Sequence, residues 1–222
     1  MIFLAHRGLW TQPGQRNSRS AFRLAFEEGF GLETDIRDFD GQLVISHDMA
    51  TKDALPLSAM LADYDAAGRP GRLALNIKAD GLAVALSKEL GAFEDMRRHA
   101  FVFDMSVPDM LHYFPTDVPV FTRSSEYESP PPLELQCQGI WMDCFVDPWA
   151  DPAEVVRRLD RGQQVAIVSP ELHNRTAYRS FWAILKKRLS QSQPPTELLN
   201  DNLMLCTDFP REAAKFFRED LK

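Results

Sequence analysis

The chain has 222 residues, of which 45% are hydrophobic and 26% are charged, as is usual for a globular protein. Its formal net charge of −7 argues against broad nucleic-acid binding, which needs a basic surface. Its three cysteines include no close Cys-x-x-Cys pair, which argues against both a disulfide framework and a zinc site.

Short apolar runs alternate along the chain with stretches of helical periodicity. The predicted strands are residues 2–5, 32–36, 73–77, 100–104, 118–122, 139–143, 164–168 and 203–207. The predicted helices are residues 18–28, 57–66, 82–90, 107–114, 151–160, 178–189 and 211–221. Ser18 is the predicted N-cap of the first, and either Asp151 or Asp147 could cap the one that ends at residue 160. Most strand runs are continuously apolar, which is typical of parallel strands covered on both faces.

Repeated strand–helix units predict a single-domain (β/α)₈ TIM barrel over residues 1–222. Residues 42–46 follow Asp40-Gly41 and predict a small β-hairpin added after the second strand. Residues 124–138 contain three consecutive prolines and are too broken for a normal helix. An open doubly wound sheet is the competing fold, but no glycine-rich loop follows the first strand.

Two carboxylates and two histidines form the most informative pattern in the chain. Glu33 and Asp35 are two residues apart on a predicted strand, so both side chains project from the same face. His6 ends the first predicted strand, and His47 ends the hairpin. Paired carboxylates suit Mg²⁺ or Ca²⁺, and histidines transfer protons near neutral pH. This combination can cleave a phosphate ester.

Further polar residues follow the other predicted strands, where the catalytic groups of TIM barrels gather. They are Asn76, Lys78, Asp104, Asp143, Glu171, His173 and Asp208. Each also has a purely structural explanation, such as a surface ion pair, a turn cap or an ordinary loop position. The prediction of a site rests on their joint occurrence at one rim.

The motifs resemble those of the glycerophosphodiester phosphodiesterase family. The resemblance is carried by His6-Arg-Gly, Asn17 before a helix, Gly31-Leu-Glu-x-Asp35, Asp40-Gly41, His47-Asp48 and Thr207-Asp-Phe-Pro. It is dense over the first 50 residues or so and sparse afterwards. Phosphatidylinositol phospholipases C and sphingomyelinases D are similar in their layout of His, Glu-x-Asp and His.

The resemblance implies roles for most of these residues. His6 and His47 would be the general acid and base, and Glu33 and Asp35 would bind Mg²⁺ or Ca²⁺. Arg7 and Lys78 would hold the phosphate. A substrate hydroxyl beside the phosphate would attack first and give a cyclic phosphate that water can open. The rim residues could bind substrate hydroxyls; they are Asp104, Asp143, Glu171 and His173.

Asn76 departs from the family pattern, in which a glutamate stands in Glu-x-Lys on the third strand. An amide oxygen can bind Mg²⁺ or Ca²⁺, but it carries no charge. We therefore expect Asn76 to be a weaker third metal ligand, with Asp104 or Asp143 as candidates to compensate from neighbouring strands. The alternatives are a phospholipase-type lyase that stops at the cyclic phosphate and a non-catalytic barrel that binds a phosphorylated sugar or polyol.

The expected partner is a small phosphodiester bearing a polyol or sugar, and no nucleic acid. Residues 1–5 lack the features of a signal peptide, and no apolar run is long enough to cross a membrane, so we expect a cytoplasmic protein. The sequence does not predict an oligomeric state.

Overall fold

The apolar runs form the strands of the computed structural model, which describes residues 1–146, 151–192, 199 and 201–218. Contacts between residues divide the chain into two compact units. One unit holds residues 4–121, and the other holds residues 1–3 and 122–222. The single domain expected from chain length therefore stays a prediction.

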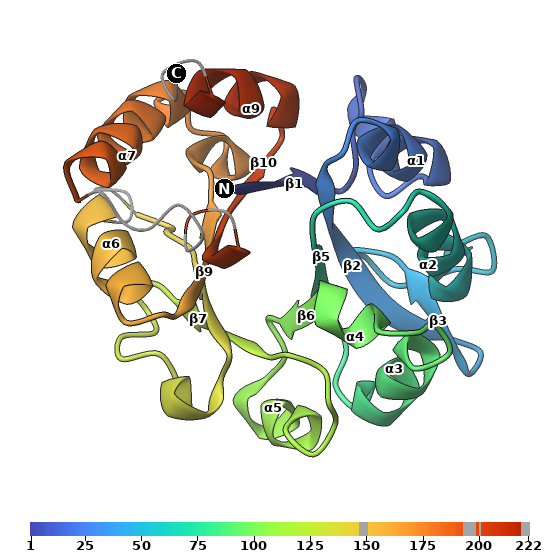
Figure 1. Ribbon diagram of the computed structural model, residues 1–222. Coiled ribbons are helices and arrows are strands. Elements are labelled where there is room, and N and C mark those ends of the chain that lie inside the picture. Colours follow the sequence, from blue (N-terminus) through green and yellow to red (C-terminus); the bar gives the residue numbers. More distant parts are fainter. Residues whose placement is uncertain (147–150, 193–198, 200, 219–222) are drawn as a thin grey trace. The chain divides into compact units, whose positions relative to one another are not determined.

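Parallel strands form the centre of the unit of residues 4–121. They are β1 (Ile2–His6), β2 (Gly31–Phe39), β5 (Leu73–Ile77) and β6 (Ala100–Phe103). β1 pairs with β2, β2 with β5, and β5 with β6 (Figure 1). Every residue of β5 and β6 is buried, which fits their sequences, apolar throughout except for Asn76 of β5.

A hairpin extends β2 beyond its predicted end at residue 36. β2 pairs antiparallel with β3 (Gln42–Ile45), which also pairs with the short β4 (Leu55–Pro56). Asp40 and Gly41 both have positive φ, +49° and +76°, as a tight two-residue hairpin turn requires. Because this pairing continues to Phe39, β2 is longer than its apolar run.

Helices lie along the strands of this unit. They are η1 (Pro13–Gln15), α1 (Arg19–Glu27), α2 (Leu57–Ala66), α3 (Ala83–Leu90), α4 (Met96–His99) and α5 (Val107–Tyr113). The predicted cap of α1 is confirmed, because Ser18 Oγ accepts a hydrogen bond from the Ala21 amide at 3.2 Å. The sequence does not predict the single-turn helix α4, because one turn is too short to show periodicity.

The predicted strand at residues 118–122 is shifted in the structure, where β7 spans Phe121–Ser124. Pro119 has no amide hydrogen and cannot donate to a strand ladder. Its carbonyl still accepts from the Val102 amide at 2.9 Å, and Val120 forms a single bridge with Val102. The first half of the predicted strand therefore makes only one bridge to β6.

The unit of residues 122–222 contains a second set of parallel strands. β8 (Gly139–Met142) pairs with β9 (Gln164–Val168), which pairs with β10 (Leu203–Thr207). Its helices are η2 (Glu134–Gln136), α6 (Pro152–Asp160), η3 (Pro170–His173), α7 (Tyr178–Ser192) and α9 (Pro210–Arg218). The described proline-rich segment, residues 124–138, contains no helix longer than the single turn η2, as predicted. Residues 219–221 of the predicted last helix and the alternative cap Asp147 lie outside the described residues.

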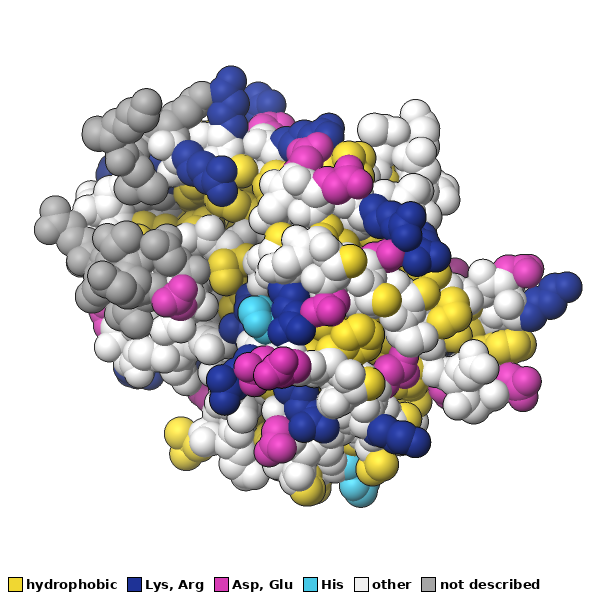
Figure 2. Space-filling model, turned by 45° about the vertical axis from the view of Figure 1, so that its right-hand side comes forward, with side chains coloured by type: hydrophobic (Ala, Val, Ile, Leu, Met, Phe, Trp, Pro, Cys, Tyr) yellow, Lys and Arg dark blue, Asp and Glu magenta, His cyan; other side chains and the backbone are white. Residues whose placement is uncertain are grey.

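Charged side chains of both signs are mixed on the surface. Figure 2 shows Lys and Arg side chains beside Asp and Glu side chains, with a histidine among them near the middle of the visible face. Among the described residues, no helix combines the length and the apolar character that a membrane span requires.

Candidate active site

The two carboxylates of β2 are buried beside the neighbouring strands. Glu33 is 2% exposed and Asp35 is fully buried. The register sets Glu33 opposite His6 of β1 and Asp35 opposite Asn76 of β5. The period-two spacing and the parallel pairing therefore bring residues from three strands together, as the sequence predicts.

Asp35 is surrounded by donors and cations. Arg7 Nε lies 3.0 Å from its Oδ2, and Lys78 Nζ lies 3.4 Å from its Oδ1. Asn17 Nδ2 donates to Oδ2 at 2.8 Å, and Asn17 Oδ1 accepts from Thr34 Oγ1 at 2.9 Å. These contacts compensate for the burial of the carboxylate and fix it in place. In the sequence, Asn17 stands out only through its motif, which does not reveal this contact.

The backbone beside Asp35 is held in an unusual conformation. Arg7 and Asn17 have φ values of +57° and +58°, in the left-handed region that side chains other than glycine rarely adopt. The Arg7 amide donates to the Glu33 carbonyl at 2.9 Å, and the Asn17 amide donates to the Arg7 carbonyl at 2.9 Å. This network directs both side chains toward the β2 carboxylate.

Glu33 has fewer partners than Asp35. His6 Nε2 lies 3.8 Å from its Oε2, and Asn76 Nδ2 lies 3.4 Å from its Oε1. Burial and the neighbouring Asp35 raise the pKa of Glu33 from 4.5 to about 7, although the charges of His6, Arg7 and Lys78 act in the opposite direction. Without a further cation, Glu33 is therefore only partly ionised near neutral pH.

The oxygen atoms at this site fit a hard divalent cation. Glu33 Oε2, Asp35 Oδ1 and Asn76 Oδ1 are all buried and accept no hydrogen bond. Buried polar atoms are normally satisfied, so such a set suggests a ligand. Mg²⁺ and Ca²⁺ take carboxylate and amide oxygens. Among the described residues, no group of three or more His, Cys, Asp or Glu side chains stands out as a metal site, and the set above combines two carboxylates with one amide.

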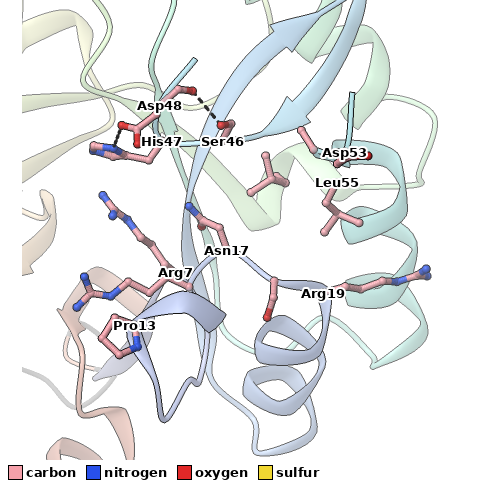
Figure 3. A pocket seen from close by; sticks show the side chains of 13 residues that line it. Arg7, Pro13, Asn17, Arg19, Ser46, His47, Asp48, Asp53 and Leu55 are labelled. Atoms are coloured by element: carbon pink, nitrogen blue, oxygen red, sulfur yellow. Dashed lines mark hydrogen bonds and ion pairs between the residues drawn. The ribbon is translucent and has the colours of Figure 1, made fainter. Parts of the chain in front are cut away.

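His47 lies on a cleft of about 620 Å³ in the same unit. The cleft lies between the loop after β1 and the loop after β3, and Arg7 and Asn17 also line it (Figure 3). His47 Nδ1 is 2.9 Å from Asp48 Oδ1, and the His47 side chain is 47% exposed. The cleft is thus lined both by His47, the second predicted histidine, and by Arg7, which is predicted to bind phosphate.

Arg16 also lines this cleft, and no motif or spacing in the sequence singles it out. Its guanidinium lies 4.3 Å from the centre of the Trp10 ring, and Trp10 Nε1 donates to the His6 carbonyl at 2.9 Å. A cation over an indole face is a favourable arrangement. Trp10 therefore links the end of β1 to one wall of the cleft.

Three of the four residues predicted to bind substrate hydroxyls, Asp143, Glu171 and His173, lie in the unit of residues 122–222. His173 Nε2 is 2.8 Å from Asp143 Oδ1, so these two residues form a pair. Glu171 accepts hydrogen bonds from Ser169 and Thr207, and burial raises its pKa. The binding of substrate hydroxyls by Asp143, Glu171 and His173 stays a prediction.

Asp104, the fourth of these residues, lies beside the cluster of Glu33, Asp35 and Asn76, because its Oδ2 accepts a hydrogen bond from Asn76 Nδ2 at 3.1 Å. It follows β6 directly and has a φ of +67°. The structure thus assembles His6, Glu33, Asp35, Asn76 and Asp104 within the unit of residues 4–121.

Comparison with solved structures identifies the fold. No protein-family model and no curated protein sequence matches the chain. A candidate glycerophosphodiester phosphodiesterase from Galdieria sulphuraria is similar with a TM-score of 0.69 and 14% identity, over 97% of each chain. A glycerophosphodiester phosphodiesterase from Parabacteroides distasonis ATCC 8503 is similar with a TM-score of 0.65 and 16% identity, over 100% of this chain and 98% of that one.

A third similar structure is the glycerophosphodiester phosphodiesterase from Agrobacterium tumefaciens str. C58. Its TM-score is 0.60 at 16% identity, over 98% of each chain. At such low identity these similarities establish the fold and leave the chemistry to the residues themselves. The chain therefore has the mixed α/β fold of solved glycerophosphodiester phosphodiesterases, which confirms at the level of fold the resemblance that its motifs indicate.

Proposed function

We propose that this protein is a phosphodiester hydrolase that resembles glycerophosphodiester phosphodiesterases and works with a divalent cation. The observation that carries the proposal is the set of three buried oxygen atoms, on Glu33, Asp35 and Asn76, that accept no hydrogen bond. Two cationic side chains, Arg7 and Lys78, lie within 3.4 Å of the Asp35 carboxylate. Cation ligands and positive side chains together stabilise the negative charge that develops when a phosphate diester is cleaved.

Glu33, Asp35 and Asn76 would hold Mg²⁺ or Ca²⁺. The bound cation would supply charge neutralisation at the phosphoryl oxygens. Arg7 and Lys78 would bind the same phosphate, because each is anchored on Asp35 and keeps further N–H groups for a second acceptor. Anchoring lowers the entropy lost when a long side chain binds substrate.

His6 and His47 would move the protons. One imidazole would accept the proton of the attacking hydroxyl, and the other would donate a proton to the leaving oxygen. Contact with Glu33 at 3.8 Å orients the His6 ring, and contact with Asp48 at 2.9 Å orients the His47 ring. The attacking group is a substrate hydroxyl next to the phosphate, which gives a cyclic phosphate that water then opens.

The substrate is proposed to be a small diester with a polyol or sugar group. Asp143, Glu171 and His173 would contribute to binding its hydroxyls. The closed (β/α)₈ barrel and the cytoplasmic location predicted from the sequence belong to the same proposal. The similar solved structures support its reaction class, since they are named as glycerophosphodiester phosphodiesterases.

The test is a screen of glycerophosphodiesters and sugar phosphodiesters with Mg²⁺, Ca²⁺ or a chelator. His6→Ala and His47→Ala are each expected to lower the rate by about 10²–10⁴-fold with the fold retained. His112→Ala provides the matched control, because His112 is exposed on α5. Full activity in either site variant would refute the assignment.

Analysis of the products separates the alternatives. A cyclic phosphate that accumulates without opening identifies a lyase. Tight binding of a phosphorylated sugar or polyol without turnover with either cation identifies a non-catalytic binding protein. Turnover to a monoester and a free alcohol supports the hydrolase.

A further inference from the structure

The orientation of the Asn76 side chain follows from its neighbours. Its Nδ2 lies 3.1 Å from Asp104 Oδ2 and 3.4 Å from Glu33 Oε1. A charged carboxylate can only accept hydrogen bonds, so the amide nitrogen, and not the amide oxygen, must face Asp104. The oxygen of Asn76 is then directed away from Asp104, and it is buried without a hydrogen-bond donor.

The alternative orientation of this amide would harm a cation site. The last torsion of an asparagine side chain is soft, and its two orientations are close in energy without specific partners. Turning the amide would present the NH₂ group to the cation and an oxygen to two carboxyl groups. A cation site therefore requires a contact that fixes one orientation of the amide. The hydrogen bond to Glu33 is too long, at 3.4 Å, to do this alone.

Asp104 is held in a conformation that keeps it next to Asn76. It is the residue after β6, and the register pairs Asn76 with Phe103, so Asp104 is one residue beyond the partner. Its φ of +67° is left-handed, which costs about 1–2 kcal/mol for a residue with a Cβ. Such a conformation at a candidate site suggests a function for this residue.

We propose that Asp104 is a positioning residue for Asn76. Its carboxylate holds the amide nitrogen, so that the amide oxygen joins Glu33 Oε2 and Asp35 Oδ1 as a cation ligand. It also places a negative charge one hydrogen bond away from a ligand that carries none. The pair of Asn76 and Asp104 thereby replaces a single carboxylate ligand. This inference rests on the cation site of the proposed function and not on the reaction.

The inference is tested by cation affinity in solution, measured calorimetrically with Ca²⁺ and Mg²⁺ and without substrate. Asp104→Gly removes the carboxylate and tolerates a positive φ. It is expected to weaken binding by about 10–100-fold, the usual cost of losing a partner of a metal ligand. Asp104→Asn is expected to weaken binding less, because its amide oxygen can still accept from Asn76.

Exchanging the two groups gives the sharper test. Asn76→Asp alone sets a carboxylate against Asp104, and the two repel each other. In the double variant Asn76→Asp with Asp104→Asn, the amide at 104 donates to the carboxylate at 76. Because that carboxylate carries its own charge and presents an oxygen in either orientation, the double variant is expected to recover the cation binding that Asp104→Asn loses when residue 76 is Asn.

The outcomes differ for each explanation. If Asp104 binds the cation directly, the double variant has lost a ligand and stays weaker than the wild type, and the inference is wrong. If Asp104 has no part in the site, Asp104→Asn leaves cation affinity unchanged with either residue at position 76. The same is expected for the control Asp117→Asn, because the Asp117 side chain is 92% exposed. Failure of the wild type to bind either cation also overturns it. Recovery of cation binding in the double variant supports the inference even if no diester is hydrolysed, which would refute only the proposed function.

Discussion

The buried carboxyl group of Glu33 should make the stability of the protein depend on pH in a specific direction. Glu33 is 2% exposed, and its neighbour Asp35 is fully buried. Its pKa is about 7 in the folded protein, against an ordinary value of 4.5. Because the folded state holds this proton more tightly, the stability contribution is complete below pH 4.5 and is lost as the pH rises through 7.

The size of the effect follows from the shift in pKa. Each unit is worth about 1.4 kcal/mol, so the contribution of Glu33 to the free energy of unfolding should fall by roughly 2 to 3 kcal/mol between about pH 5 and 8. Glu33→Gln mimics the protonated group and has no proton to lose. The difference in stability between wild type and variant should therefore change with pH by this amount, with the variant favoured at high pH.

Urea unfolding in the presence of a chelator at several pH values measures this difference. Glu27→Gln is a suitable control, because Glu27 is exposed on α1 and the substitution is the same. A free energy of unfolding of the wild type that differs from that of Glu33→Gln by the same amount at every pH would contradict this reasoning. That result would show that burial beside Asp35 does not raise the pKa of Glu33. Added Ca²⁺ should reverse the trend, since a cation favours the charged carboxylate.

Two further predictions concern stability. Gly8→Ala should lower the free energy of unfolding by about 2–4 kcal/mol in urea. Gly8 has a φ of +95°, and an added Cβ would lie 2.8 Å from the Ala21 side chain; unchanged stability would contradict that close approach. Asp63→Ala should cost about 1–2 kcal/mol by the same measurement, because Asp63 pairs with Arg19 at 2.6 Å and Arg23 at 2.8 Å. Its charged form is stabilised by Arg19, which lowers its pKa to about 2, so this cost should remain at pH 5 and shrink as the pH falls from about 4 toward 2.

Most elements are predictable from the sequence where the local signal is strong. The apolar run of β5 and the capped helix α1 lie close to their predicted positions. The errors arise where pairing or backbone chemistry decides the boundary. β2 is extended by its hairpin with β3, and β7 begins late because Pro119 cannot donate to the neighbouring strand.

The candidate site is predictable in its residues but not in its contacts. The spacing of Glu33 and Asp35 is enough to place both side chains on one face of a strand. The roles of Asn17 and Asp104 depend on hydrogen bonds between residues 18 and 28 positions apart. Such contacts follow from strand register and positive φ, which sequence periodicity does not encode.

The left-handed conformation of Arg7 has a practical consequence for engineering. Glycine at this position would relieve about 1–2 kcal/mol of backbone strain, but it would also remove the guanidinium 3.0 Å from the buried Asp35 carboxylate, a loss of about 3–5 kcal/mol. Directed evolution that screens only for heat tolerance should therefore retain arginine at this position despite its unfavourable backbone conformation. A library built on this scaffold should fix position 7 and search for stability elsewhere.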